Sequence, residues 1–411
     1  MAQADRLVGA AEFGDRRDLQ PEHVEAVFLE FLGRTAAPRD VEMWMGIGSL
    51  RALLDGVLAS EEYAARLAKR AVGEDAREEG PFLNFWVAGL ERFTRPVGTI
   101  SADGVAIVGA RGHLFLYGGS NDNLAMYRGE IAMAPDWSEQ WRELVAERHA
   151  SALAAGRALC YLVVPDKLAV YADLFPQDLE TGRPRPVMRL LEHVALPLLY
   201  PAGALRDARA GGDTYMMTDS HLTVAGNRLI AHATIGALGA RPELLEVIPL
   251  AQLEQFASGD LGQHFTPPIM EVRQHLAAAS AATIVLDNWP AVSRAGGHIG
   301  TLRIFRRDDA PDSRTVVIFG DSYGFGDEAY PGLSWFLAQV FREVHFVWAP
   351  FGWDPDYLDR VGAELVVCQT AERFIARVPR RRVDVQSLAQ EIGERGGTLG
   401  LERVFGDAAV G

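Results

Sequence analysis

A serine, a histidine and an aspartate in two short motifs carry the clearest chemical potential of this sequence. Ser322 lies within Gly320-Asp321-Ser322-Tyr323-Gly324, and the motif Asp219-Ser220-His221 precedes it in the chain. A serine hydroxyl is a weak nucleophile at neutral pH, so it needs a base within hydrogen-bond reach and a carboxylate that fixes the tautomer of that base. The sequence therefore predicts a catalytic triad of Ser322, His221 and Asp219.

The neighbours of both motifs favour this prediction. Residues 315–319 have the composition of a strand, and a serine between glycines just after a strand lies where a sharp turn exposes its hydroxyl. Asp321 is expected to hydrogen-bond nearby amides of that turn. For the second motif another role is open, because Asp219 or Ser220 is also a suitable N-cap for the helix that is predicted to follow. The two roles are compatible.

Acyl transfer also needs hydrogen-bond donors for the oxyanion that develops on the attacked carbonyl. One donor is expected to be the backbone N–H of Ser322 or of its neighbour, since the turn aims these amides at the reacting group. The second donor is left open among the side chains of Tyr323, Asn121, Asn123, Asn288 and Arg373. The alternative for Arg373 is a structural salt bridge with Glu372.

The elements that must position these residues alternate between strands and helices. Apolar runs predict strands at 105–109, 158–164, 315–319, 344–348 and 364–368, and helical spacing predicts helices at 136–156, 186–198, 223–238 and 332–343. This alternation predicts an α/β fold with a parallel sheet flanked by helices, and chemistry at the carboxyl ends of the strands, where Pro165, Ser322 and Gln369 lie. The segments 173–220 and 241–300 are predicted to form the walls of a cleft.

The first part of the chain has a different character. Apolar residues at helical spacing in 21–70 predict a small all-helical module, and the charged stretch 73–81 is typical of a linker. We therefore predict a helical module and linker at 1–78 and the catalytic domain at 79–411. Trp44 and Tyr63 are interpreted as core residues of the module rather than as a sugar-stacking surface.

Composition excludes several classes of protein. A formal net charge of −15 argues against a nucleic-acid partner, because phosphate binding needs clustered Lys and Arg, and the one basic cluster, 377–382, is expected to be a solvated rim. No apolar run approaches the ~20 residues that span a bilayer. The opening Met1-Ala2-Gln3-Ala4-Asp5-Arg6 has no apolar signal region, so a cytoplasmic location is expected.

No metal or organic cofactor is expected. The ten histidines show no paired-ligand spacing typical of zinc sites. The two cysteines, Cys160 and Cys368, lie inside strand-like apolar runs, where a disulfide is possible between neighbouring strands but buried, reduced thiols are favoured.

An Asp-X-His motif that pairs with a distant serine resembles the triad of SGNH or GDSL lipases, but there the serine comes first. The order found here resembles the SGNH-like O-acetyltransferase family of the alginate acetylation proteins AlgJ and AlgX. Further segments follow that family's order over roughly residues 80 to 380, namely 108–116 with Asn121 and Asn123, the Pro-X-Lys element at 165–167, 218–226, and 365–374. His113 and Leu222 stand where the family usually has tryptophan, which reduces the expected aromatic surface near the triad. The helical module is similar to a short domain of unknown function that recurs in bacterial cell-surface and carbohydrate-related proteins.

This resemblance implies a serine O-acetyltransferase that acts on a carbohydrate through an acetyl-serine intermediate, in bacterial polysaccharide modification. The acetyl donor is then delivered by a partner, such as a membrane-bound acyltransferase, or by a small activated ester. The alternatives are a carbohydrate O-acetyl esterase, which shares the acyl-enzyme, and a non-catalytic polysaccharide-binding or assembly subunit. The family members are exported to the periplasm, in contrast to the location expected from the N-terminus.

Overall fold

The computed structural model describes most of the chain from residue 95 to residue 396 and parts of the N-terminal region. The described residues are 19, 21–32, 34–47, 52–53, 56–57, 60–63, 65, 95–119, 122–193, 198–246, 248, 252–266, 268–276, 280–294, 296–326 and 331–396.

A seven-stranded sheet forms the centre of the molecule, in the order β4-β3-β11-β9-β10-β8-β7. Its strands are β3 (Ala158–Val164), β4 (Leu198–Leu199), β7 (Thr283–Asp287), β8 (Leu302–Arg306), β9 (Asp312–Gly320), β10 (Phe341–Trp348) and β11 (Leu365–Ala371). The neighbouring strands β4, β3, β11, β9 and β10 are parallel, and β8 pairs antiparallel with both β10 and the edge strand β7. The mixed α/β class is confirmed, and β8 and β7 are an addition to the predicted parallel sheet.

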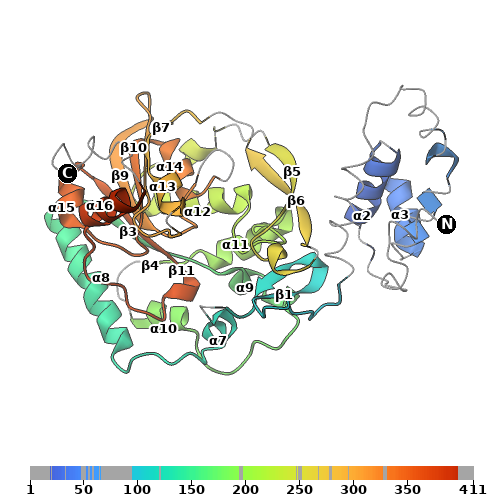
Figure 1. Cartoon of the computed structure of the whole chain (residues 1–411), viewed down its shortest axis with the longest axis horizontal. Coiled ribbons are helices and arrows are strands. Elements are labelled where there is room, and N and C mark those ends of the chain that lie inside the picture. The colour runs from blue at the N-terminus through green and yellow to red at the C-terminus, as the bar shows by residue number, and fades with distance from the viewer. Residues whose placement is uncertain are drawn as a thin grey trace.

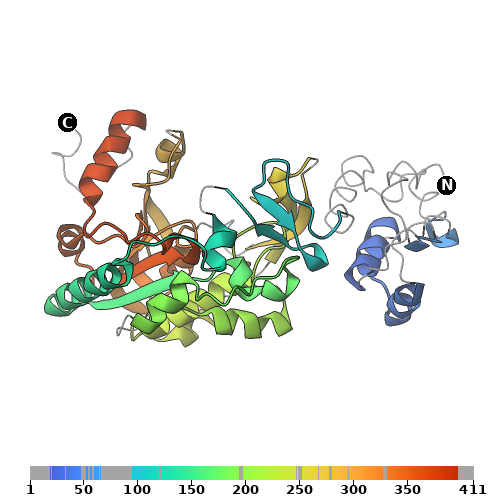
Figure 2. The same cartoon turned by 90° about the horizontal axis from the view of Figure 1, so that it is seen from below.

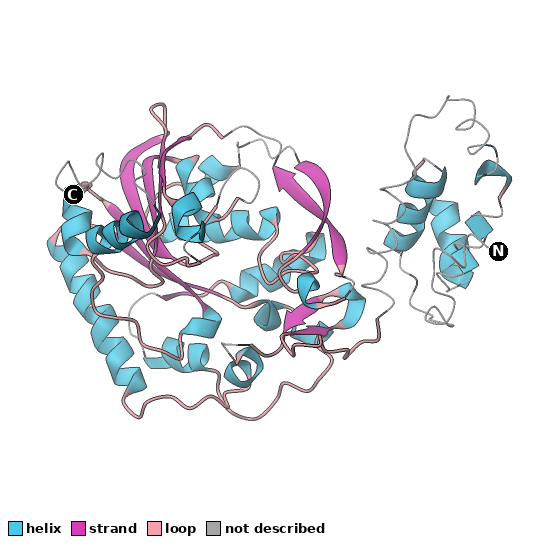
Figure 3. Ribbon diagram, in the orientation of Figure 1, coloured by secondary structure: helices cyan, strands magenta, loops and turns pink. Residues whose placement is uncertain are grey.

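The predicted strand at 105–109 lies outside this sheet. It forms β1 (Ala106–Val108), which pairs with β2 (Leu114–Leu116) in a two-stranded ribbon of its own. A second ribbon joins β5 (Gln252–Ser258) to β6 (Met270–Leu276), and it stands apart from the central sheet (Figure 3). The segment 241–300, predicted to form a wall of a cleft, contains the regular strands β5, β6 and β7.

Helices cover both faces of the central sheet, as the alternation of buried side chains requires. On β3, Cys160, Leu162 and Val164 belong to one core cluster, whereas Tyr161 and Val163 belong to the other. The first cluster includes residues of α12 (Val224–Ala237) and α14 (Leu333–Ala338), and the second includes residues of α8 (Trp137–Ala154), α10 (Pro186–His193) and α15 (Pro355–Arg360). The long helix α8 runs along one flank of the sheet in both views (Figure 1, Figure 2).

The remaining helices are shorter. They are α7 (Asn123–Tyr127), α9 (Lys167–Val170), α11 (Ala202–Ala208), α13 (Trp289–Arg294) and α16 (Val385–Gly396). The helix predicted at 332–343 ends as α14 at Ala338, because the chain turns there and Phe341 already begins β10. The helix predicted at 186–198 is described as α10 over Pro186–His193, and Leu198 already belongs to β4.

Within the N-terminal region, α2 (Pro21–Val27), the π-helical turn Phe28–Leu32 and α3 (Pro38–Ile47) share a small core. Tyr63 is buried in that core and Trp44 packs against it, as the core interpretation of both residues expects. The linker predicted at 73–81 lies outside the described residues, so the domain boundary stays a prediction.

Cys160 and Cys368 are both free and buried. They belong to opposite core clusters, so their side chains point to opposite faces of the sheet and cannot form a disulfide. In the described part of the chain, no helix has the length and apolar character that crossing a membrane requires.

Candidate active site

The nucleophile turn begins where β9 ends. A Cβ at Gly320 would lie 2.4 Å from Oε1 of Gln369, so a larger residue would displace this side chain from its 2.9 Å hydrogen bond with the N–H of Asp321. The Asp321 carboxylate accepts hydrogen bonds from the backbone N–H of Tyr323 (3.0 Å), the backbone N–H of Ala371 (2.6 Å) and the amide of Gln369 (2.8 Å). Asp321 therefore ties the turn to β11, as expected for a structural turn residue. Gln369 lies within β11 rather than just past it.

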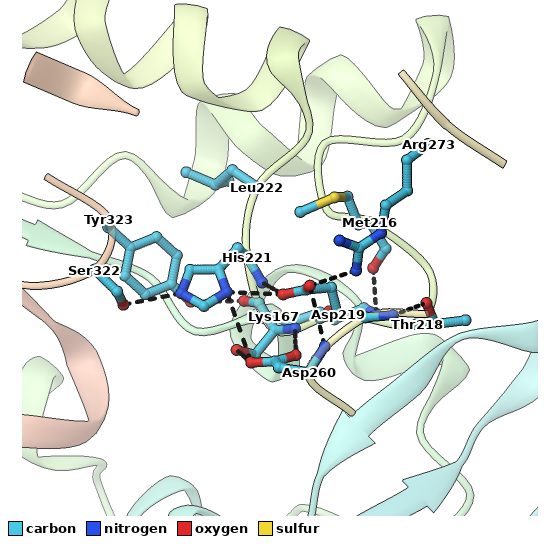
Figure 4. Close-up of polar contacts among 12 residues, drawn as sticks. Lys167, Met216, Thr218, Asp219, His221, Leu222, Asp260, Arg273, Ser322 and Tyr323 are labelled. Carbon is cyan, nitrogen blue, oxygen red and sulfur yellow. Dashed lines mark hydrogen bonds and ion pairs between the residues drawn. The ribbon is translucent and has the colours of Figure 1, made fainter. Parts of the chain in front are cut away.

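The structure brings the three predicted triad residues into one chain of hydrogen bonds (Figure 4). Ser322 Oγ lies 2.9 Å from His221 Nε2, and His221 Nδ1 lies 2.7 Å from Asp219 Oδ1. The backbone N–H of His221 also donates to Asp219 Oδ1 at 2.9 Å. With the carboxylate on Nδ1, the ring presents Nε2 as the acceptor of the serine proton, which is the arrangement that general-base activation requires.

Arg273 on β6 and the backbone of Asp260 hold the second oxygen of the Asp219 carboxylate. Oδ2 accepts from Nη2 of Arg273 at 2.5 Å and from the N–H of Asp260 at 3.2 Å. The side chains of Arg273 and Asp219 are only 6% and 8% exposed, so this ion pair is largely withdrawn from water. Burial alone would raise the pKa of Asp219, but the hydrogen bond and charge of His221, together with Arg273, hold it well below its usual value. A pKa below the usual value keeps the Asp219 carboxylate ionised at neutral pH.

The same carboxylate acts on the histidine. Burial would lower the pKa of His221, but the hydrogen bond and the charge of Asp219 outweigh it and raise the pKa above its ordinary value. A raised pKa strengthens His221 as a base for the serine proton. The Tyr323 ring lies beside it, with the ring centroids 5.1 Å apart.

A buried lysine and a buried glutamate fix the segment that carries Asp219 and His221. Lys167 Nζ donates to the carbonyl oxygens of Met216 (2.6 Å), Met217 (2.7 Å) and Asp219 (3.2 Å), and burial lowers the pKa of Lys167 to about 8. Glu271 accepts from the backbone N–H groups of Met217 and Thr218, at 2.7 and 2.8 Å. The family-like Pro-X-Lys element thus shapes the triad loop.

The helix after the triad loop has its own cap. Thr223 is the N-cap of α12, and its hydroxyl accepts from the N–H of Gly226 at 3.1 Å. A Cβ at Gly226 would lie 2.1 Å from the carbonyl oxygen of Thr214, so a side chain at this position would clash with the neighbouring backbone. The N-cap role that was considered for Asp219 or Ser220 is therefore wrong, and these two residues take part in the candidate site instead.

The candidate oxyanion donors are placed differently. Among the described residues, no acceptor binds the N–H of Ser322, whereas the N–H of Tyr323 is taken by Asp321. Asn123, at the start of α7, is 2% exposed, and no hydrogen-bond partner for its buried Oδ1 lies among the described residues. That oxygen is an acceptor, so an oxyanion would have to be bound by Nδ2 of the same amide, which bonds no acceptor among the described residues. Asn121 lies outside the described residues. The N–H of Ser322 and Nδ2 of Asn123 are therefore the candidate donors that remain.

Tyr323, Asn288 and Arg373 already have hydrogen-bond partners. The Tyr323 hydroxyl donates to the carbonyl of Ser220 at 2.7 Å and so supports the triad loop beside His221. The side-chain amide of Asn288 donates to the carbonyl of Gly300 (3.1 Å) and accepts from the N–H of Leu302 (2.6 Å). It therefore joins the two ends of the loop between Asn288 and Leu302.

Arg373 donates to Asp166 Oδ1 at 2.6 Å and to the Tyr323 hydroxyl at 3.3 Å. The alternative partner Glu372 is wrong, since it pairs with Arg185 at 3.0 Å. Arg373 also lines a pocket of about 550 Å³ together with Thr370 and Phe374, at the carboxyl end of β11.

Sequence reasoning missed Arg273 and Asp260. In β6, Glu271 and Arg273 alternate with Val272, and charged residues two apart on one strand share a face. This pattern is a sequence signal for a polar, partnered face, but it does not name Asp219 as the partner. Asp260, in the turn between β5 and β6, accepts from Ser220 N–H at 2.6 Å. No sequence motif around Asp260 indicates this contact.

Asp219, His221 and Asp260 also present possible metal-ligand atoms within 4.8 Å of one another. A cation bound there would have to replace the 2.7 Å hydrogen bond between Asp219 Oδ1 and His221 Nδ1. The cluster is accounted for by the triad, so it gives no reason to revise the expectation that no metal takes part.

No protein-family model and no curated protein sequence matches the chain. The fold is similar to that of the O-acetyltransferase domain of Pseudomonas putida AlgJ, with 16% identity and a TM-score of 0.40 over 71% of this chain and 99% of that domain. A DHHW family protein from Eubacterium siraeum has 14% identity and a TM-score of 0.46 over 72% and 99% of the two chains. Pseudomonas aeruginosa AlgX has 12% identity and a TM-score of 0.39 over 69% and 66%.

AlgJ and AlgX are the proteins that the ordered sequence motifs resemble. At these identities the similarity concerns the fold alone, and the chemistry proposed below rests on the motifs and on the geometry of the site.

Proposed function

We propose that this protein is a serine-dependent O-acetyltransferase that acts on a carbohydrate through an acetyl-serine intermediate. The observation that carries the proposal is the continuous chain from Ser322 Oγ through His221 to Asp219, with contacts of 2.9 and 2.7 Å. Such a chain suits acyl transfer, because it supplies a nucleophile, a base and an orienting carboxylate together. The carbohydrate and the acetyl group come from the family resemblance of the motifs.

In the first half-reaction, His221 Nε2 takes the proton of Ser322 as Oγ attacks the acetyl carbonyl of the donor. The oxyanion of the tetrahedral intermediate accepts from the N–H of Ser322 and from a second donor, for which Asn123 is the candidate. The intermediate then expels the donor's alkoxide or thiolate, which takes the proton from His221. Acetyl-Ser322 and the free donor alcohol or thiol remain.

In the second half-reaction, a sugar hydroxyl gives its proton to His221 Nε2 and attacks the acetyl-serine carbonyl. Collapse of that intermediate breaks the bond to Ser322 Oγ, which recovers the proton from His221. The products are the O-acetyl sugar and free enzyme. Water in place of the sugar gives the esterase alternative with the same residues.

Labelling of Ser322 tests the triad directly. A serine-directed phosphonate or sulfonyl fluoride should modify Ser322, as located by peptide mass spectrometry, and His221→Ala should abolish the modification. An activated acetyl ester should leave one acetyl group on Ser322, and added oligosaccharide should speed its release. Labelling at another serine with Ser322 untouched would contradict the assignment, and a ligand-binding protein that never acquires an acetyl group would favour the non-catalytic alternative.

A further inference from the structure

A group of aromatic rings lies one strand away from the nucleophile and takes no part in the triad. Trp348 ends β10, where it is paired in register with Gly320 at the end of β9. Trp289 opens α13, and His298 lies in the loop that follows this helix. The three rings are nearly parallel, with interplanar angles of 8° to 17° and centroids 4.8 to 5.9 Å apart.

These rings lead from the core to the solvent. Trp348 is 9% exposed and meets Phe346 edge-on, Trp289 is half-buried, and His298 is exposed. Phe325, which follows the nucleophile turn, has its ring centroid 5.3 Å from that of Trp289 and 5.6 Å from that of Trp348. Trp289, His298, Phe325 and Trp348 therefore form an aromatic platform that is continuous with the turn carrying Ser322.

The backbone holds this platform in place. Asn288, at the base of the loop, bonds Gly300 and Leu302 through its side-chain amide, at 3.1 and 2.6 Å. The N–H of Gly300 donates to the carbonyl of Trp348 at 3.0 Å, and the N–H of Trp348 donates to Thr301 at 2.8 Å. The loop with Trp289 and His298 is thus fastened to the strand with Trp348.

Two charged side chains complete the support. Asp287 accepts from the N–H of Trp289 at 3.0 Å and pairs with Arg303 at 2.8 Å, and the Arg303 guanidinium lies 4.0 Å from the centre of the Phe325 ring. Because the rings are held before any ligand arrives, little further conformational freedom is lost when one binds. Arg303 is paired with Asp287, so its charge is balanced within the platform, and the half-buried Trp289 and the exposed His298 form the solvent side of the platform.

We propose that this aromatic platform stacks a pyranose ring of the carbohydrate acceptor and directs its hydroxyl toward acetyl-Ser322. The inference rests on the proposed function. The apolar C–H face of a pyranose packs on an aromatic ring, while the hydroxyls at its edge stay hydrated or reach polar neighbours. His113 and Leu222, which were expected to leave the triad with little aromatic surface, are both buried in the structure. The solvent-facing part of the aromatic platform, Trp289 and His298, comes instead from the segment after β7.

Acceptor kinetics test this inference separately from the triad. Acetyl-enzyme is prepared with an activated acetyl ester and mixed with cellohexaose or chitohexaose, and the release of acetyl from Ser322 is followed against acceptor concentration. Trp289→Ala and His298→Ala should each lower the acceptor-dependent second-order rate constant, about tenfold for Trp289→Ala, because one aromatic stack is removed. The rate of acylation by the ester is measured for each variant as a reference, so that acceptor rates are compared at equal amounts of acetyl-enzyme. Trp289→Phe should keep most of the acceptor rate.

Ile299→Ala is the matched control, since Ile299 is 54% exposed in the same loop and lies outside the stack. Equal acceptor rates in wild type, Trp289→Ala and His298→Ala would overturn the inference while leaving the acetyl-enzyme intact. If wild type forms no acetyl-enzyme, the proposed function fails and the platform is tested by binding alone. Ser322→Ala protein should then bind the same hexasaccharides, as measured by tryptophan fluorescence, and lose that binding with Trp289→Ala. Failure of Ser322→Ala protein to bind either hexasaccharide would also overturn the inference.

Discussion

Two carboxylates lie at different distances from the His221 ring. Asp219 Oδ1 is 2.7 Å from its Nδ1, and Asp260 Oδ2 is 3.6 Å away. The Asp219 side chain is 8% exposed and that of Asp260 is 43% exposed, so solvent screens the second carboxylate more strongly. Asp219 is therefore the residue that sets the tautomer of His221, and Asp260 is at best a weak substitute.

The pH dependence of turnover should show how Asp219 acts on His221. His221 must be neutral to take the serine proton, so kcat/KM should rise with pH through a pKa above the ordinary ~6.5 of histidine, in line with the raised pKa of His221. Asp219→Asn should lower kcat on the order of 10⁴, because the amide favours the wrong tautomer. The acidic limb should also move to lower pH, since burial then acts on His221 with less opposition. Ester hydrolysis from pH 5 to 9 measures both effects.

Asp260→Asn is the control for this experiment, and its effect on the rate should be much smaller. If Asp219→Asn is nearly neutral while His221→Ala is inactive, the orienting carboxylate lies elsewhere and this triad is wrong.

At the scale of the element, the β5–β6 ribbon supports the triad without supplying a reacting atom. Arg273 and Glu271 face the triad loop from β6, and Asp260 follows β5 in the turn between the two strands. Arg273 contacts the Asp219 carboxylate, and Glu271 binds the backbone just before it. The ribbon thus fixes Asp219 from the side opposite His221.

Arg273→Met should therefore impair catalysis as a loss of positioning. The variant leaves a buried Asp219 carboxylate without its cation, which should cost about 3–5 kcal/mol of unfolding free energy. Asp219 should become easier to protonate, so the acidic limb of kcat/KM should steepen and kcat should fall by one to two orders of magnitude, as roughly expected for a lost orienting contact. Chemical denaturation and the pH profile of ester turnover measure the two effects.

The matched control is Arg142→Met, which breaks the ion pair of Arg142 with Glu139, whose side chains are 57% and 53% exposed. A surface pair of this kind contributes little, so stability and turnover should change only slightly. Equal effects from Arg273→Met and Arg142→Met would show that Arg273 has no special role in the site.

In the whole molecule, the contacts of the triad within the described residues all come from the part of the chain after residue 95. The supporting residues begin at Lys167 and end at Arg373, and the helical module has a core of its own. A chain that starts near Gly80 should therefore keep the acylation rate and the pH profile of the full protein. Burst kinetics with an activated ester would show this. Loss of turnover in a truncated protein that still folds, by circular dichroism and thermal unfolding, would contradict the separation of module and catalytic domain.

Local sequence was sufficient to predict the class of the fold and the three residues of the candidate triad. Strands β3, β9, β10 and β11 were predictable because strands buried on both faces appear as continuous apolar runs. Ser322 and the Asp219-His221 pair were predictable because their chemistry depends on short-range spacing: a turn directly after a strand, and two residues of one loop. These features are local, so local sequence contains them.

The residues that surround the triad became visible only in the folded chain. Arg273 and Asp260 reach Asp219 from a ribbon far along the chain, and Trp289 meets Trp348 only because α13 begins at the edge of the sheet where β10 ends. Likewise Arg373 pairs with Asp166 rather than with its neighbour Glu372. Contacts of this kind depend on how the strands are ordered in the sheet, and a single sequence specifies that order only through the packing of the folded chain.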